Sequence, residues 1–232
     1  MVKPDYDAKK EWTNTFIAQS EMAYPAEWVI RIFKGSYPKL NLDKPSFNGK
    51  KILDISCGDG CNMPLLARCG FEVYGTEITS GIAAKTMSNL AAVGVHSDIR
   101  VGTNDNLPFE SEFFDYLLSW NACYYMGALR DFGKHVSEYS RVMRQDGYLV
   151  MSIPKKTSFI FNGSDPAPEA GYRIIRNDPY KIRNGESLRV FEDEKEIEET
   201  FSSHFKDFMF GDIHDDCFGR EYHWHIVVCK RK

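Results

Sequence analysis

The sequence predicts a doubly wound α/β fold, with a mostly parallel sheet covered by helices and an antiparallel strand pair at its C-terminal end. Three observations lead to this prediction. Short apolar runs alternate with stretches of helical periodicity between residues 51 and 153. A turn containing two glycines directly follows the first apolar run. Two further strand patterns lie near the C-terminus with only loop between them, as in an antiparallel pair.

Two helices are expected before the first strand. Apolar residues recur at helical spacing from about Tyr6 to Lys34, and Tyr24-Pro25 interrupts them. Proline removes a helix hydrogen bond and therefore separates the two helices. We expect residues 1–49 to form a helical cap. Its helices, with Trp12, Tyr24 and Trp28, are expected either to close over a ligand site of the core or to form a dimer, and packing on the core is favoured.

Residues 50–154 are expected to form the core of a single domain. The expected strands are Lys51–Ile55, Phe71–Ile78, His96–Val101, Phe114–Trp120 and Tyr148–Ile153. The expected helices are Asn62–Arg68, Ser80–Ala92 and Leu129–Arg144. Strands joined by helices of this length form βαβ units, which build a parallel sheet.

The pattern changes after Pro154. Residues 155–192 hold proline, glycine, asparagine and charged residues without a clear period, so we expect a loop-rich lid insertion. Residues 193–232 are expected to complete the core sheet. The elements expected there are a helix and two strands: Asp193–Phe201, Lys206–Ile213 and His223–Cys229.

Composition and charge argue against several classes of partner. The chain has 29 Lys and Arg against 33 Asp and Glu, a net charge of −4 that provides no basic surface for nucleic acid. No apolar run approaches the roughly 20 residues that span a bilayer. The charged N-terminus lacks a secretory signal, and the six cysteines are irregularly spaced. We expect a cytoplasmic protein with reduced thiols and no nucleic-acid or membrane partner.

Residues 54–60, DISCGDG, are the candidate ligand site. Ligands of such sheets bind beyond the carboxyl ends of the strands, where the strand order reverses. Gly58 and Gly60 permit positive φ angles and a close approach of ligand to backbone. They form only half of the dinucleotide fingerprint, because Met63 stands where its third glycine is expected. A tight turn that binds nothing is the alternative.

Two carboxylates accompany this turn. Glu77 lies 19 residues after Gly58, where an acidic group accepts hydrogen bonds from the ribose of either NAD or an adenosyl group. Asp54 lies inside the first expected strand, and a buried carboxylate costs several kcal/mol unless it is paired. We expect Asp54 to bond the N–H groups of the turn or an ammonium group of a ligand. A pyrophosphate would be repelled there.

The chain resembles the class I S-adenosylmethionine-dependent methyltransferases over about Lys50 to Pro154. The segments that carry the resemblance are ILDISCGDG, VYGTEIT, VGTNDNLPFESEFFDYLLS and RVMRQDGYLVMSIP. It implies a Rossmann-like sheet of seven strands whose last strand is inserted antiparallel. It also implies the cofactor S-adenosyl-L-methionine and the product S-adenosyl-L-homocysteine, with the methionine part over the glycine turn and the ribose on Glu77.

The residues expected to bind this cofactor are Asp54, Ser56, Cys57, Gly58, Asp59, Gly60, Glu77, Ile78, Thr103, Asn104, Asp105, Trp120 and Asn121. The chain departs from the family pattern twice. Ser56 replaces the usual first glycine, so its backbone is expected to avoid a glycine-only conformation. Thr103-Asn104 follows Gly102 where many members have Asp-Ala, so one of these two side chains is expected to contact the adenine.

Candidate acceptor and catalytic residues follow the fourth strand and cluster near the C-terminus. Trp120, Asn121, Tyr124 and Tyr125 are candidates for the floor on which the methyl group moves. His214 and His223 are candidate general bases, and Tyr124 is the third candidate catalytic residue. Structural histidines and a metal site are the alternatives, and no metal is expected.

The expected lid concentrates cations in the segment GYRIIRNDPYKIRNG. Arg173, Arg176, Lys181 and Arg183 are expected to meet an anionic acceptor, and a solvated loop is the alternative. The favoured function is transfer of a methyl group to an oxygen or nitrogen of a small molecule. The alternatives are a non-catalytic cofactor-binding regulatory subunit and an NAD-dependent oxidoreductase. The missing third glycine and Asp54 disfavour the oxidoreductase.

Overall fold

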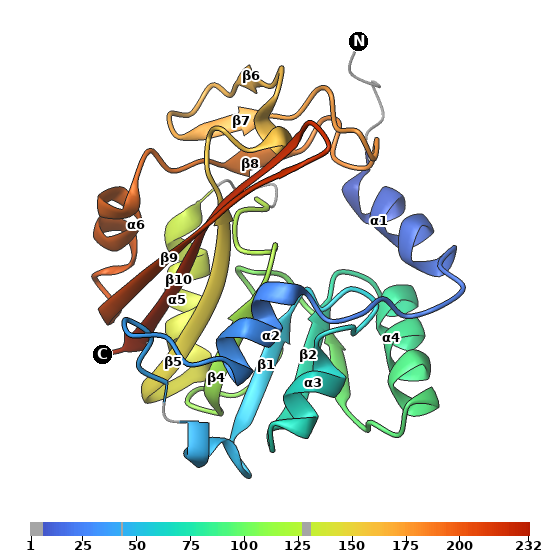
Figure 1. Ribbon diagram of the computed structural model, residues 1–232. Coiled ribbons are helices and arrows are strands. Elements are labelled where there is room, and N and C mark those ends of the chain that lie inside the picture. Colours follow the sequence, from blue (N-terminus) through green and yellow to red (C-terminus); the bar gives the residue numbers. More distant parts are fainter. Residues whose placement is uncertain (1–6, 43, 127–130) are drawn as a thin grey trace.

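A seven-stranded sheet with the order β3-β2-β1-β4-β5-β10-β9 runs through the molecule (Figure 1). The computed structural model describes residues 7–42, 44–126 and 131–232. The strands are β1 Lys51–Ile55, β2 Glu72–Glu77, β3 Asp98–Val101, β4 Phe114–Ser119, β5 Met143–Pro154, β9 Phe205–Cys217 and β10 Arg220–Arg231. Strands β1 to β5 are parallel, and β10 is antiparallel to both β5 and β9. The predicted sheet, with its inserted last strand, is confirmed.

Helices flank this sheet, as predicted (Figure 1). They are α1 Ala8–Ile17, α2 Glu27–Lys34, α3 Met63–Arg68, α4 Ser80–Ala92, α5 Phe132–Val142 and α6 Glu194–Phe201, with 3₁₀ turns at Lys44–Phe47 and Phe159–Phe161. All six residues of β4 are buried, including the polar Asp115 and Ser119, as expected for a central strand of a parallel sheet. The predicted start of α5 at Leu129 lies outside the described residues.

The N-terminal segment is tied to the first strand–helix turn of the core. Thr13 on α1 lies against α4, with its hydroxyl 3.0 Å from that of Thr79. Between α1 and α2, the N–H of Ala23 donates to the Asp59 carboxylate at 2.6 Å, and that of Ala26 donates to Asn62 Oδ1 at 3.0 Å. These bonds position α1 above the glycine turn.

The predicted lid contains a small antiparallel sheet that the sequence did not indicate. Its strands are β6 Asp165–Pro166, β7 Tyr172–Ile174 and β8 Ser187–Arg189. Strands of two or three residues are too short to show an alternating pattern. Long-range bonds support them instead, among them those of the Arg189 guanidinium to the carbonyl of Gly171 at 2.8 Å and to Glu196 at 2.6 Å.

The C-terminal strands are longer than predicted. β9 and β10 form one hairpin that turns at Phe218-Gly219, where φ is +53° and +82°. The predicted end of β9 at Ile213 is wrong, because His214, Asp215 and Asp216 also lie inside this strand. Their polar, exposed side chains conceal the strand from a search for apolar alternation.

The boundary between α5 and β5 also differs from the prediction. The helix ends at Val142 and β5 begins at once with Met143, five residues before the predicted start. The strand register shifts between the pairs Phe114–Met143 and Tyr116–Tyr148, and Asp146 inside this irregularity has a φ of +59°. A bulge therefore hides the first part of the strand.

The helices and the cysteines of the described residues bear on membrane insertion and on disulfide formation. None of the described helices combines the length and apolar character needed to cross a bilayer. All six cysteines are free thiols, and Cys57, Cys123 and Cys229 are buried.

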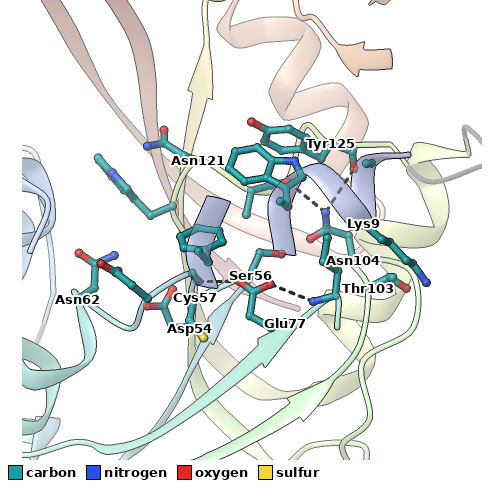
Figure 2. A pocket seen from close by; sticks show the side chains of 18 of the residues that line it. Lys9, Asp54, Ser56, Cys57, Asn62, Glu77, Thr103, Asn104, Asn121 and Tyr125 are labelled. Atoms are coloured by element: carbon teal, nitrogen blue, oxygen red, sulfur yellow. Dashed lines mark hydrogen bonds between the residues drawn. The ribbon is translucent and has the colours of Figure 1, made fainter. Parts of the chain in front are cut away.

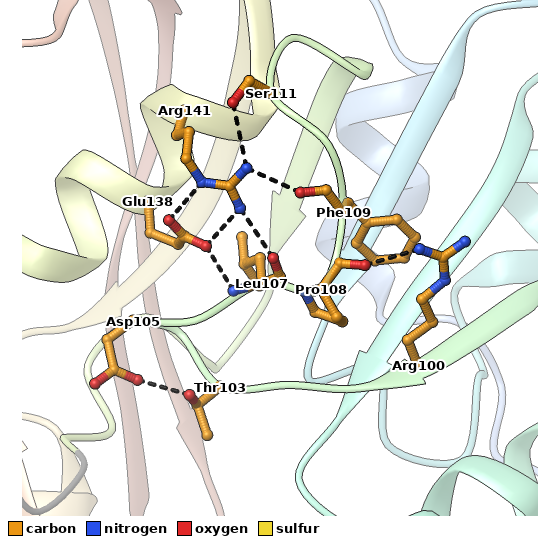
Figure 3. A network of polar contacts seen from close by, with 9 residues as sticks. All are labelled: Arg100, Thr103, Asp105, Leu107, Pro108, Phe109, Ser111, Glu138 and Arg141. Atoms are coloured by element: carbon orange, nitrogen blue, oxygen red, sulfur yellow. Dashed lines mark hydrogen bonds and ion pairs between the residues drawn. The ribbon is translucent and has the colours of Figure 1, made fainter.

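The loop between β3 and β4 is held against α5 by Arg141 (Figure 3). Its guanidinium donates to the carbonyls of Leu107 and Phe109, both at 2.9 Å, and pairs with Glu138 at 2.7 Å. Glu138 in turn accepts from the N–H of Leu107 at 2.7 Å. This network fixes the end of the loop whose start, residues 103–105, borders the cavity described below.

We expect Arg141→Met to lower the free energy of unfolding by about 1–2 kcal/mol, because two carbonyls and a carboxylate lose a charged donor that is partly exposed. Urea titration measures the change. Lys134→Met, an exposed substitution on the same helix, is the control and should leave the unfolding midpoint unchanged. Equal midpoints for both variants would contradict the role of Arg141.

Candidate functional site

A cavity of about 450 Å³ opens beyond the carboxyl ends of β1, β2, β3 and β4 (Figure 2). β1 leads to β2 on one side, whereas the adjacent β4 leads to β5 on the other, so the cavity lies where the strand order reverses. Twelve of the thirteen residues expected to bind the cofactor line it: Asp54, Ser56, Cys57, Gly58, Asp59, Glu77, Ile78, Thr103, Asn104, Asp105, Trp120 and Asn121. Gly60 is the exception.

The two glycines of the turn have different structural roles. Gly58 has a φ of +61°, and a Cβ there would lie 2.8 Å from the ring of Phe16 on α1. Gly60 has a φ of +86°, and a Cβ there would lie 3.0 Å from Thr86 Cγ2 on α4. Gly60 therefore serves the close packing of the turn on α4. The Thr86 hydroxyl also donates to the Gly58 carbonyl at 2.5 Å.

Two non-glycine residues at the cavity have left-handed backbones. Ser56 directly follows β1 with a φ of +54°, in the left-handed region that favours glycine but that a serine can also adopt. Asn121 follows the adjacent strand β4 with a φ of +55°. The left-handed conformation of each of these residues costs about 1–2 kcal/mol relative to an ordinary backbone conformation. The N–H of Asn121 donates to Ser152 Oγ at 2.8 Å, and that hydroxyl donates to Asn121 Oδ1 at 3.1 Å, which stabilises the strained turn.

Glu77 joins the end of β2 to the glycine turn. Its Oε1 accepts from the N–H of Gly58 at 2.6 Å, and its Oε2 accepts from that of Ile78 at 3.0 Å. Burial raises the pKa of the carboxyl to about 7, although both N–H bonds act in the opposite direction. Each carboxylate oxygen keeps further acceptor capacity toward the cavity, as binding of ribose hydroxyls requires.

Asp54 is the least satisfied polar group of the cavity. Its side chain is buried, and Oδ2 has no hydrogen-bond partner among the described residues. Burial, followed by the charge of Glu77, raises the pKa of Asp54 to about 8, and a bond from Asn62 opposes this increase. A buried carboxylate oxygen without a donor is costly. A cationic donor in the cavity would remove that cost.

The end of the cavity near β3 departs from the expected adenine contacts. Asn104 donates through Nδ2 to two backbone carbonyls after β4, at 3.1 and 3.3 Å, and accepts from Tyr139 Oη at 2.6 Å. Both N–H groups of this amide are therefore engaged inside the protein. Thr103 donates to Asp105 at 2.6 Å, and this pair is left to contact a ligand at that end.

The N-terminal segment forms the roof of the cavity, which is one of the two roles that the sequence left open for it. α1 contributes Lys9, Trp12 and Phe16 to the lining, and the Trp12 ring meets Tyr125 edge-on at 5.7 Å. Arg183 from the lid donates to the Tyr125 hydroxyl at 2.6 Å. The helical spacing of Trp12 and Phe16 was the available signal, but such spacing does not reveal which surface a helix covers.

The sequence did not indicate that a buried histidine lines the cavity. His135 on α5 lines the cavity with Nδ1 3.2 Å from the carbonyl of Cys123, and burial lowers its pKa. Its neutral ring lies at the same end as Asn104 and Tyr139, as its ring contact with Tyr139 at 6.5 Å indicates. A single His inside a predicted helix offers no sequence signal of this position.

The predicted catalytic residues lie outside this cavity. His214 and His223 pair across the hairpin with stacked rings 3.7 Å apart, and His223 Nδ1 lies 3.0 Å from Thr157 Oγ1. Tyr124 is fully buried, burial raises its pKa, and it lines a second cavity. Neither histidine lines either cavity, so their position lends no support to a role as general base.

The residues that could hold a metal ion differ from the two histidines considered in the sequence analysis. Among the described residues, His225 is the histidine of the hairpin that lies beside two carboxylates, those of Glu194 and Asp212. The candidate ligand atoms of these three residues lie within 4.8 Å of one another. Lys155 already supplies positive charge there, because its Nζ lies 2.7 Å from Asp212 Oδ1.

Three of the four lid cations are bonded within the lid. Arg176 pairs with Asp165 at 2.6 Å, Arg183 pairs with Asp178 at 3.0 Å, and Arg173 donates to the Ser164 carbonyl at 2.6 Å. Of the four predicted cations, only Arg183 lines either cavity. The structure does not bring them together as a site for an anion.

Comparison with known proteins agrees with this geometry. Residues 53–151 match the family model described as a methyltransferase domain. A ubiquinone biosynthesis O-methyltransferase of Azorhizobium caulinodans is 28% identical over 109 residues, which are 47% of this chain and 42% of that protein. A phthiotriol/phenolphthiotriol dimycocerosates methyltransferase of Mycobacterium ulcerans is 31% identical over 105 residues, 44% of this chain and 37% of that protein. The chain thus spans less than half the length of these curated relatives.

Solved structures share the fold over most of the chain. The PH0226 protein of Pyrococcus horikoshii has a TM-score of 0.62 at 20% identity, covering 82% of this chain and 85% of that one. A 1,6-didemethyltoxoflavin-N1-methyltransferase of Burkholderia thailandensis, solved with 1,6-didemethyltoxoflavin and S-adenosylhomocysteine, has a TM-score of 0.57 at 14% identity, covering 80% and 72%. Residues 53–151 therefore form a methyltransferase domain, and the chain shares the fold of solved S-adenosylmethionine-dependent methyltransferases.

We expect Asp54→Asn to stabilise the unliganded chain at pH 8. The raised pKa values of Asp54 and Glu77 mean that the folded chain retains protons which the unfolded chain releases above about pH 4. Stability therefore falls as the pH rises toward 8, by up to about 1.4 kcal/mol per pH unit for each group. The amide removes one of these groups and should flatten the dependence.

Thermal unfolding between pH 5 and pH 9 measures this effect. Each kcal/mol corresponds to a shift of about 2–4 °C in Tm for a chain of this size. Asp98→Asn, which changes a surface carboxylate, is the control and should keep the wild-type pH profile. A wild-type profile for Asp54→Asn would show that the Asp54 carboxyl is not perturbed.

Proposed function

We propose that the protein transfers a methyl group from S-adenosylmethionine to an oxygen or nitrogen of a small molecule. The observation that carries this proposal is the buried, unpartnered Oδ2 of Asp54 beside the glycine turn. An ammonium group satisfies such an oxygen, and a zwitterionic amino acid part carries one. A pyrophosphate would add negative charge next to Asp54 and Glu77, which argues against a nicotinamide dinucleotide.

The remaining cavity residues suit the other parts of the cofactor. We assign the ribose to Glu77, the amino acid part to Asp54 and the turn at Gly58, and the adenine to the end held by Thr103 and Asp105. When bound, the cofactor supplies a methyl group on a positively charged sulfur. The chain's contribution is to orient the two reactants and to exclude water beneath α1.

The transfer itself requires alignment more than acid–base chemistry. The acceptor's lone pair forms a bond to the methyl carbon while the carbon–sulfur bond breaks and its electrons pass to sulfur. The acceptor's proton then leaves to water. Positioning of two reactants can supply about 7–11 kcal/mol of the barrier, so no residue has to act as general base. This supports transfer without a role for His214 or His223.

The small-molecule acceptor is supported by the relatives and by space in the structure. The curated relatives include an O-methyltransferase of ubiquinone biosynthesis, and a structural neighbour was solved with 1,6-didemethyltoxoflavin bound. A second cavity of about 600 Å³ adjoins the first and shares Trp12, Phe16, Trp120 and Asn121 with it. Volumes of this size accommodate small organic ligands.

Calorimetric titration with S-adenosylmethionine, S-adenosylhomocysteine and NAD tests the cofactor. We expect micromolar binding of both adenosyl ligands and none of NAD. Glu77→Ala and Asp54→Asn should each weaken adenosyl binding at least tenfold, and Asp98→Asn should not. Binding of NAD alone would overturn the proposal. Release of S-adenosylhomocysteine by the purified chain with added acceptors distinguishes the enzyme from a non-catalytic binding subunit.

Cofactor binding is expected to release protons. At pH 6.5 Asp54 is protonated in the free chain, because burial raises its pKa to about 8, and an ammonium ligand requires the carboxylate. The observed binding enthalpy should therefore depend on the ionisation enthalpy of the buffer, with release approaching one proton. This release should diminish as the pH approaches 9. Buffer-independent enthalpies at pH 6.5 would contradict the assigned contact.

A further inference from the structure

The second cavity, which we call the aromatic chamber, adjoins the cofactor cavity through shared residues. Trp12, Phe16, Ala26, Trp120, Asn121 and Arg183 line both. An acceptor must reach the methyl group across such a boundary, so the inference below rests on the proposed function. It concerns the chemical class of the acceptor.

Aromatic rings dominate the chamber. Nine of its nineteen described lining residues are aromatic, and six of these belong to the chamber alone: Trp28, Tyr124, Phe159, Tyr180, Tyr222 and Trp224. Phe159, Tyr222 and Trp224 contact one another, with ring centroids 4.8 to 5.8 Å apart. Ring faces of this kind favour planar π systems and cations, and they offer little to aliphatic or anionic groups.

The charges of the chamber do not favour an anion. Arg183 is the one cation among the described lining residues, and it is held by Asp178 at 3.0 Å and by the Tyr125 hydroxyl at 2.6 Å. The Asp178 side chain is fully buried, so it neutralises Arg183 without competition from water. The other charged residues of the lining are Glu27 and Asp215, both acidic.

Two polar groups of the chamber lack partners among the residues that the structure describes. Trp224 is 5% exposed, and its indole Nε1–H is buried without an acceptor. Gln19 Oε1 is buried without a donor. Buried polar groups are normally hydrogen-bonded, so a ligand that both accepts and donates would complete this wall. A hydroxyl or an amino group does both.

We infer that the aromatic chamber binds a planar aromatic molecule that bears a hydroxyl or amino group and carries no negative charge. The ring stacks among the aromatic side chains, and the polar group meets Trp224 and Gln19 or turns toward the shared boundary. Phenols and aromatic amines belong to this class. It replaces the anionic acceptor expected from the lid cations, because Arg173, Arg176 and Arg183 are bonded to lid carboxylates or carbonyls and Lys181 lines neither cavity.

Four probes separate the properties that this inference requires. They are 4-ethylphenol, tyramine, 4-hydroxyphenylacetate and 2-cyclohexylethylamine, which differ in charge or in the presence of the ring. Each is titrated by calorimetry and by saturation-transfer NMR into the full chain saturated with S-adenosylhomocysteine. We expect 4-ethylphenol and tyramine to bind at least tenfold more tightly than the anionic and the aliphatic probe.

Variants locate the binding in the chamber. Trp224→Phe keeps a ring but removes the N–H donor, and should weaken 4-ethylphenol binding about three- to tenfold. Tyr180→Leu removes a half-exposed ring with little risk to folding and should also weaken binding. Tyr37→Leu changes a similarly exposed tyrosine outside the chamber and should have no effect. Unchanged affinity for S-adenosylhomocysteine shows that each variant is folded.

The outcomes distinguish this inference from the proposed function. Preferred binding of the anionic or the aliphatic probe, or binding of no probe to the cofactor-saturated chain, overturns the inference and leaves the proposed function intact. Probe binding that neither Trp224→Phe nor Tyr180→Leu weakens overturns it as well. Failure of S-adenosylhomocysteine to bind overturns the proposed function and, with it, the inference.

Discussion

The bond between Glu77 and the N–H of Gly58 is the contact on which the site depends. It joins the end of β2 to the turn after β1, at 2.6 Å and out of contact with bulk water. The carbonyl of Gly58 in turn accepts a hydrogen bond from the Thr86 hydroxyl. With both polar groups of Gly58 engaged, the turn is fixed beside Asp54, which lines the cavity. The two N–H groups that donate to Glu77 offset part of the cost of burying its carboxylate.

The roof depends on the same turn. Asp59 lies in the turn, and Asn62 directly precedes α3. Their side chains accept hydrogen bonds from two N–H groups of the segment between α1 and α2. Phe16 can then lie against Gly58, a position that any Cβ at 58 would block. Because Phe16 also lines the aromatic chamber, one helix borders both cavities. Closure over the cofactor and shaping of the acceptor space are therefore coupled through α1.

Charge is distributed in opposite ways in the two parts of the site. In the cofactor cavity Asp54 and Glu77 are close enough to raise the pKa of Asp54, and no basic side chain is among the causes of either shift. A cation therefore brings favourable energy there. In the lid, Arg183 and Asp178 form a buried pair that is bonded internally. Such pairs contribute to a defined geometry more than to attraction of an outside ligand.

The sequence by itself determined the sheet, its last antiparallel strand and the ligand-binding turn. β1 and α4 have the predicted bounds, because apolar periodicity and capping act over a few residues. Asp54 and Glu77 lie at the carboxyl ends of β1 and β2, and Asn121 follows β4. Parallel strands necessarily bring these ends to one edge of the sheet. Only the tertiary structure decided that α1 covers the cavity, that the Asn104 amide is engaged internally, and that His214 stacks on His223. Those outcomes depend on contacts between distant segments, which local patterns do not encode.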